Sequence, residues 1–200
     1  MPYRPEIDPQ GTYHVGSRGT YGRTLFRTRG EHELFLELYE RTADKYGWNT
    51  LAWTLMKNHH HFVIELTNGG LSEGMRELHG GYSRRIHAVY GQTRKGHLFR
   101  HGFFAGRLAD ERAVVAACAY VDLNPSKNRL RASPRRGDWC SYAATLGLDR
   151  LRPFHRPEKL LRLFGRDMAQ SRVAYRKLTQ QIHAERAAES SPNDGVQTAT

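Results

Sequence analysis

Residues 49–66 read NTLAWTLMKNHHHFVIEL, and this stretch decides the fold of the chain. Its two halves, 49–55 and 59–66, are rich in the apolar and β-branched residues that are typical of strands. The polar pair Lys57-Asn58 lies between them and has the composition of a turn. The stretch therefore predicts a β-hairpin whose second strand opens with three consecutive histidines.

The three histidines differ in the face of the sheet that they occupy. Successive side chains on a strand point to opposite faces, so His59 and His61 share one face, while His60 should pack or form a hydrogen bond on the other. Alternate residues of a strand are about 6–7 Å apart, so two imidazoles on a rigid strand can bind one metal ion at little conformational cost. Apolar residues on both sides of the run indicate that the pair lies in a central strand.

The rest of the chain alternates strand and helix patterns up to about residue 125. The order of strand, helix, two strands, helix, strand and helix indicates an α+β, ferredoxin-like fold, an antiparallel sheet with helices packed on one face. Outside the hairpin we expect a strand at 11–18, a helix at 31–46 and an extended segment or strand within 97–108. A further helix is expected to be capped by Ser72 and to end near residue 90. The last helix of this part should begin at Asp110 or Glu111 and end near Asn124, because Pro125 follows.

The distribution of apolar, polar and helix-breaking residues divides the sequence into three segments. Residues 1–150 are expected to form the main domain, and residues 151–187 a helical extension that is mostly one long polar helix. Residues 188–200 are small and polar and include Pro192 and Gly195, so we expect a disordered tail.

The chain is strongly basic. Its 200 residues include 31 lysines and arginines against 20 aspartates and glutamates, a formal net charge of +11. This excess indicates a polyanionic partner, with nucleic acid as the first candidate and a merely soluble basic protein as the alternative. No apolar run approaches the ~20 residues that a membrane span needs, and the N-terminus lacks the apolar core of a signal peptide. The two cysteines, Cys118 and Cys140, have no metal-type spacing, so reduced cytosolic thiols are expected. Together with the basic charge, this indicates a cytoplasmic, nucleoid-associated protein.

A second group of candidates lies on the predicted helix before Pro125. Tyr120 and Asn124 are four residues apart and therefore share one helix face, and the nearby alanines keep that face open to a sheet or a nucleic-acid backbone. The spacing alone leaves a structural reading open, in which Tyr120 is a core aromatic and Asn124 a polar residue at the helix end.

Several motifs occur in a fixed order between about residues 10 and 145. They are Tyr13-His14-Val15 with Ser17-Arg18-Gly19, Met56-Lys57-Asn58-His59-His60-His61, Gly96-His97-Leu98-Phe99, Tyr120-Val121-Asp122-Leu123-Asn124-Pro125 and Ser141-Tyr142. In this set and order the chain resembles the REP-associated tyrosine transposases of the HUH single-strand endonuclease superfamily, close to the small insertion-sequence transposases that move single-stranded DNA. Two positions depart from the family pattern, Lys57 in place of the usual proline and His60 in place of a bulky apolar residue.

The resemblance implies an HUH-type domain at residues 1–150, whose site combines both groups of candidates. It implies that His59 and His61 hold a divalent ion, Mg²⁺ or Mn²⁺, and that Asn124 adds an oxygen ligand. Tyr120 is then the nucleophile that forms a 5′-phosphotyrosine and releases a free 3′-hydroxyl. The implied enzyme cleaves and rejoins DNA at REP-like hairpins.

Single-stranded or hairpin DNA is the expected partner, bound by a monomer or a homodimer, with no membrane involved. His14 is expected in a structural or DNA-contact role rather than as a metal ligand. Basic side chains expected to contact the DNA are Arg18, Arg84, Arg85, Arg100, His101, Arg107 and Lys127. Aromatic candidates for stacking on unpaired bases are Tyr21, Phe99, Phe103, Phe104 and Trp139.

Two other functions fit parts of the pattern. A non-catalytic DNA-binding regulator or DNA-organising protein could share the fold, but the presence of both groups of candidates favours the enzyme. A histidine-triad nucleotide hydrolase needs a third alternate histidine after His61, and Val63 stands there instead.

Overall fold

One antiparallel sheet organises the chain, which a computed structural model describes at residues 7–91, 96–100, 102–126, 134 and 137–189. Its strands are β1 (Thr12–Arg18), β2 (Asn49–Met56), β3 (His59–Glu65) and β4 (Phe104–Arg107). They lie in the order β2-β3-β1-β4, so β3 is a central strand, as predicted. β2 and β3 form the predicted hairpin, in which Met56 pairs with His59.

Most helices lie close to their predicted positions. α3 (Glu111–Leu123) follows Asp110, whose side chain accepts a hydrogen bond from the Ala113 amide at 2.8 Å. The predicted cap at Ser72 is wrong, because the cap lies two residues earlier, at Gly70 in left-handed geometry, and α2 (Leu71–Tyr90) begins directly after it. Across the described part of the chain, none of the helices has the length and apolar character of a membrane span. The others are η1 (Thr20–Gly22), α1 (Arg29–Tyr46), η3 (Asn124–Ser126), α4 (Tyr142–Thr145), α5 (Pro157–Leu161), η4 (Arg162–Phe164) and α6 (Met168–Glu189).

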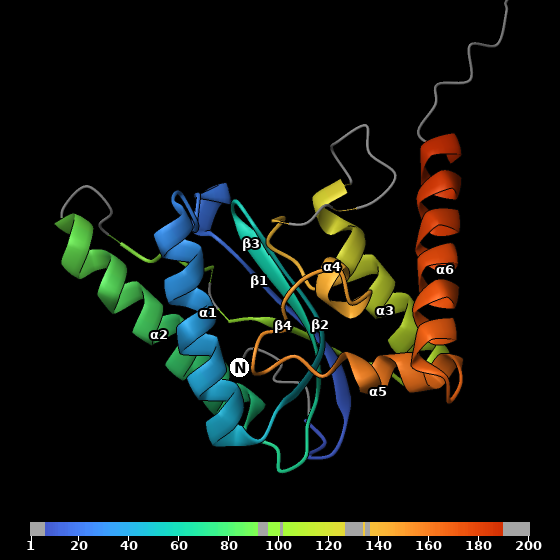
Figure 1. Ribbon diagram of the computed structural model, residues 1–200. Coiled ribbons are helices and arrows are strands. Elements are labelled where there is room, and N and C mark those ends of the chain that lie inside the picture. The colour runs from blue at the N-terminus through green and yellow to red at the C-terminus, as the bar shows by residue number, and fades with distance from the viewer. Residues whose placement is uncertain (1–6, 92–95, 101, 127–133, 135–136, 190–200) are drawn as a thin grey trace, which may run out of the picture.

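Helices cover both faces of the sheet (Figure 1). α1 and α2 pack on one face, and α3, α5 and α6 lie on the other. The α+β class is confirmed, but the prediction of helices on one face only is wrong. The run Phe62-Val63-Ile64 in β3 is buried at every position, and side chains that alternate between two buried faces need cover on both.

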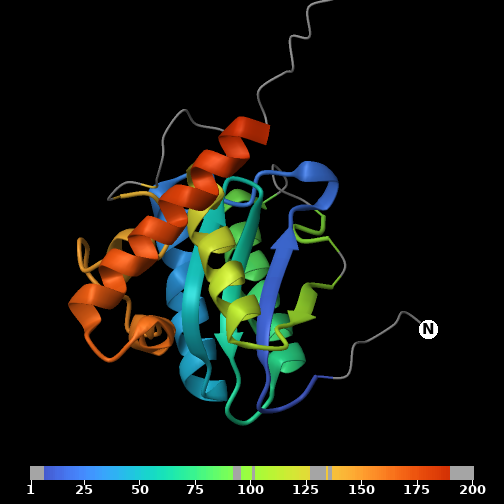
Figure 2. The ribbon, with the colours of Figure 1, turned by 90° about the vertical axis from the view of Figure 1, so that its right-hand side faces the viewer.

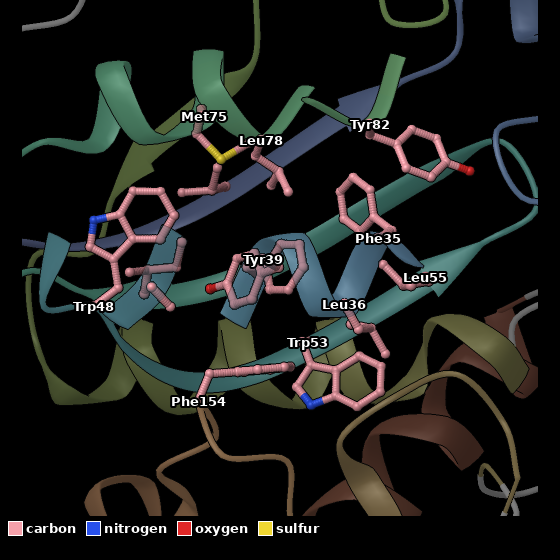
Figure 3. Packing of buried hydrophobic residues seen from close by; sticks show 14 of the residues in the cluster. Phe35, Leu36, Tyr39, Trp48, Trp53, Leu55, Met75, Leu78, Tyr82 and Phe154 are labelled. Carbon is pink, nitrogen blue, oxygen red and sulfur yellow. The ribbon is translucent and has the colours of Figure 1, made fainter. Parts of the chain in front are cut away.

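Aromatic rings form much of the core on the α1 side (Figure 3). Tyr39 of α1 stacks on Phe62 with 3.9 Å between ring centroids. The ring of His60 lies 5.0 Å from that of Phe35, and its Nε2 is 3.0 Å from Nε2 of His79 in α2. Burial lowers the pKa of His60 well below 6.5 and that of His79 to about 3, so this histidine pair is neutral near pH 7. The prediction that His60 packs or forms a hydrogen bond on the opposite face is confirmed.

A buried carboxyl joins the C-terminal helices to α3. Asp122 accepts hydrogen bonds from the hydroxyl of Tyr175 in α6, at 2.7 Å, and from the hydroxyl of Ser141 before α4. All three side chains are fully buried, and Leu160 of α5 belongs to the same side of the core. Burial raises the pKa of Asp122 to about 7, although the two hydrogen bonds act in the opposite direction.

This carboxyl predicts a pH dependence of stability. The pKa of Asp122 is about 7 when folded and 3.8 when exposed, so between these values the folded chain binds more protons and its stability falls as the pH rises. We expect the free energy of unfolding to lose about 4 kcal/mol between pH 4 and pH 8 from this group, a loss that Asp122→Asn should lack. Urea unfolding measures it, with Glu37→Gln, an exposed acid of α1, as the control. Parallel pH profiles for Asp122→Asn and the wild type would contradict the prediction.

Candidate functional site

A cavity of about 580 Å³ lies on the α3 face of the sheet, beside the pair formed by His59 and His61. α3 contacts β2 and β3, and in Figure 2 none of the described helices lies in front of β1 and β4 on this face. His59, His61 and Tyr120 all line the cavity, so the structure brings together three predicted site residues from separate parts of the sequence. The other lining residues are His14, Gly16, Ser17, Arg18, Arg100, Gly102, Phe103 and Phe104.

His59 and His61 project from the same face of β3, with ring centroids 5.2 Å apart. Each ring has a hydrogen-bond partner at Nδ1. Asn58 Oδ1 lies 2.8 Å from Nδ1 of His59, and His14 Nε2 lies 3.0 Å from Nδ1 of His61. A partner at Nδ1 fixes the orientation of an imidazole and directs Nε2 to a ligand, which is the usual arrangement of metal-binding histidines.

β1 makes the space in which His61 lies. Gly16 pairs with His61 across the sheet, and a Cβ at position 16 would come within 2.7 Å of His61 Nδ1. The missing side chain lets the imidazole lie over β1, within reach of His14. His14 therefore has a structural role at the site, because it orients a candidate ligand.

Tyr120 faces the histidines from α3. Its ring centroid is 5.9 Å from that of His61 and 5.6 Å from that of His14. The guanidinium carbon of Arg186 in α6 lies 5.5 Å from the tyrosine centroid, a cation–π contact. The Tyr120 side chain is only half-buried, so it is not a sealed core aromatic. No sequence motif pointed to Arg186, because its position depends on how α6 crosses α3.

Asn124 lies at the end of α3 and is 4% exposed. Its Nδ2 donates a hydrogen bond to the Tyr120 carbonyl oxygen at 3.1 Å. It is not among the residues that line the cavity. In this position Asn124 acts as a polar residue at the helix end, and its role as third metal ligand stays a prediction.

The cavity supplies some, but not all, of the ligands that a divalent ion needs. Two imidazoles on one rigid strand, both oriented through Nδ1, suit a shared cation. In the described ranges, no group of three or more histidine, cysteine, aspartate or glutamate side chains is arranged to hold a metal ion. Further ligands would therefore be amide, water or phosphate oxygens, which Mg²⁺ and Mn²⁺ accept.

The predicted DNA-contact residues that the structure describes lie in different places, and only some of them are at the cavity. Arg18 and Arg100 line the cavity, and Arg18 pairs with His59 across the sheet. Arg84 and Arg85 are exposed on α2, which packs on the opposite face, and Arg107 forms an ion pair of 2.6 Å with Asp8. His101 and Lys127 lie outside the described residues.

The predicted stacking aromatics also divide. Phe103 and Phe104 line the cavity, and Phe104 is 58% exposed. Phe99 is buried against His79, with 4.0 Å between ring centroids, and Trp139 stacks on His32 at 4.5 Å. The ring of Tyr21 projects fully into solvent.

Comparisons with known proteins identify the family and the fold of the chain. The sequence profile of the family described as "Transposase IS200 like" matches residues 9–124, and the chain belongs to this family. Among solved structures it is similar to the REP-associated tyrosine transposase bound to a REP hairpin, with a TM-score of 0.61 and 12% sequence identity. That likeness covers 77% of this chain and 93% of the other, and at this identity it shows the shared fold. No curated protein matches the sequence.

Proposed function

We propose that this transposase-family protein is a metal-dependent nuclease and strand transferase that cleaves and rejoins single-stranded DNA at hairpins. The cavity in which Tyr120 faces His59 and His61 is the observation that carries the proposal. The net charge of +11, with Arg18 and Arg100 at the cavity, would attract the DNA backbone. A protein of the same fold is bound to a REP hairpin, which supports a hairpin as the substrate.

In the proposed reaction the Tyr120 hydroxyl oxygen attacks the phosphorus of the scissile phosphate. The bond from phosphorus to the 3′ oxygen breaks, the hydroxyl proton ends on that oxygen, and the 5′ end stays attached as a phosphotyrosine. One ester replaces another, so attack by a different 3′-hydroxyl can rejoin the strand without an energy source. The Arg186 guanidinium, close to the tyrosine ring, could donate hydrogen bonds to non-bridging oxygens.

His59 and His61 would hold the cation, Mg²⁺ or Mn²⁺, with Asn124 as the proposed third protein ligand. A bound divalent ion polarises a non-bridging phosphate oxygen and helps to align the backbone for in-line attack. His14 and Asn58 keep the two imidazoles oriented through their Nδ1 atoms.

A DNA-binding regulator on the same fold is the second candidate. The position of Asn124 favours it, since the described cavity contains two candidate metal ligands and not three. The nucleophile-bearing cavity favours the enzyme, because a regulator has no need of a tyrosine beside a histidine pair.

A covalent-adduct assay separates the two. Labelled hairpin oligonucleotides are incubated with the protein and Mn²⁺ or Mg²⁺ and run on a denaturing gel. We expect a retarded band whose digest contains a DNA-linked Tyr120 peptide, and we expect EDTA to abolish it. Hairpin binding with no adduct would favour the regulator, and an adduct that persists in EDTA would contradict the metal dependence.

A further inference from the structure

The turn η1 presents the most exposed large hydrophobic side chain among the described residues. Tyr21 is 104% exposed. Its backbone is left-handed, with φ 52° and ψ 35°, and it is the one described residue other than glycine with a positive φ. A tyrosine is strained in this geometry, and such strain is concentrated at sites where function requires it.

The backbone around Tyr21 is fixed on two sides. The Gly19 amide donates to the Asn58 carbonyl at 2.8 Å, and the Thr20 amide donates to the Leu98 carbonyl at 3.0 Å. A Cβ at Gly19 would lie 2.1 Å from the Arg23 carbonyl oxygen, so the turn is also tightly packed. The Tyr21 ring is therefore held out into solvent by an anchored loop.

A second hollow of about 1010 Å³ lies beside this ring. Its walls include Arg18, Arg23, His97 and Arg100 as well as Tyr21. Arg18 and Arg100 also line the cavity of the histidine pair, so the two hollows adjoin and share their basic wall. DNA that leaves the candidate nuclease site on this side would meet the arginines and then the exposed ring.

We propose that this second hollow binds the unpaired nucleotides that flank the hairpin, with the Tyr21 ring as a stacking platform for one base. The proposal rests on the proposed function, because it names the part of the same DNA that the hollow takes. Guanidinium groups neutralise phosphates, and an exposed aromatic ring stacks on any unpaired base. Bases inside a duplex stem already stack on one another, so the ring discriminates in favour of unpaired DNA.

Binding in EDTA tests this inference apart from cleavage. Dissociation constants are measured by fluorescence anisotropy for one hairpin with and without a short unpaired flank. Tyr21→Gly should weaken binding of the flanked hairpin about five- to hundredfold and leave the unflanked one within about twofold. Its Tm should not fall, because glycine adopts a positive φ without strain. Tyr21→Trp should keep the preference for the flank, and 2-aminopurine in the flank should be quenched by the wild type but not by Tyr21→Gly.

Matched variants control for charge and exposed apolar surface. Arg23→Gln should reduce the preference for the flank, whereas Arg41→Gln, at an exposed position of α1, should not. Leu148→Ala removes a side chain that is 54% exposed outside the hollow and should behave as wild type. Equal affinity of the wild type for both hairpins, or equal losses for both in Tyr21→Gly, would overturn the inference. Preference for the flank without any adduct would overturn the nuclease proposal alone.

Discussion

Tyr120→Phe is expected to lose the covalent adduct and strand cleavage by at least about 10³-fold, while its affinity for hairpin DNA stays within about twofold of wild type. The substitution removes only the hydroxyl. The ring contacts with His61 at 5.9 Å and His14 at 5.6 Å, and the cation–π contact with Arg186, should all persist. A labelled-hairpin adduct assay gives the first quantity and anisotropy in EDTA gives the second.

Tyr90→Phe is the matched control for this prediction. Tyr90 ends α2, on the opposite face of the sheet, and its replacement should change neither quantity. An adduct that survives in Tyr120→Phe would show that another group is the nucleophile. A large loss of affinity in the same variant would show that the hydroxyl serves binding instead.

Strand periodicity was sufficient to predict half of the candidate site. Alternation alone assigned His59 and His61 to one face of β3 and His60 to the other, because side-chain direction on a strand is a local property. The structure agrees, with His60 buried against α1 and α2 and the other two at the cavity. The link to Tyr120 came from a resemblance in the order of motifs, which carries long-range information that periodicity lacks.

What could not be predicted depends on strand register and helix packing. The hydrogen bond between His14 and His61 requires Gly16 to pair with His61, and nothing in the local sequence of either strand sets that register. Arg186 reaches Tyr120 only because α6 packs on α3. The buried hydrogen bond that Tyr175 donates to Asp122 contributes to this packing. The exposure of each arginine likewise follows from the fold rather than from its neighbours in sequence.

His61→Ala is expected to reduce adduct formation by at least about 10²-fold and to weaken Mn²⁺ binding by at least about tenfold. The substitution removes a candidate ligand and leaves the basic walls of both hollows in place, so hairpin affinity in EDTA should stay within about threefold. Manganese binding is measured by electron paramagnetic resonance of the free ion, which reports on the site independently of cleavage. His59→Ala should give the same pattern, because both imidazoles are proposed to hold the same cation.

His60→Gln is the control that the histidine run itself supplies. His60 lies between the two candidate ligands in the sequence but faces His79 on the opposite side of the sheet, with 3.0 Å between the two Nε2 atoms. Loss of that buried pair should lower stability by about 1–3 kcal/mol and leave the adduct yield per folded molecule unchanged. If His60→Gln lost manganese binding while His61→Ala kept it, the cation would have to lie on the α1 face. The proposal of a metal-assisted tyrosine nuclease at the Tyr120 cavity would then fail.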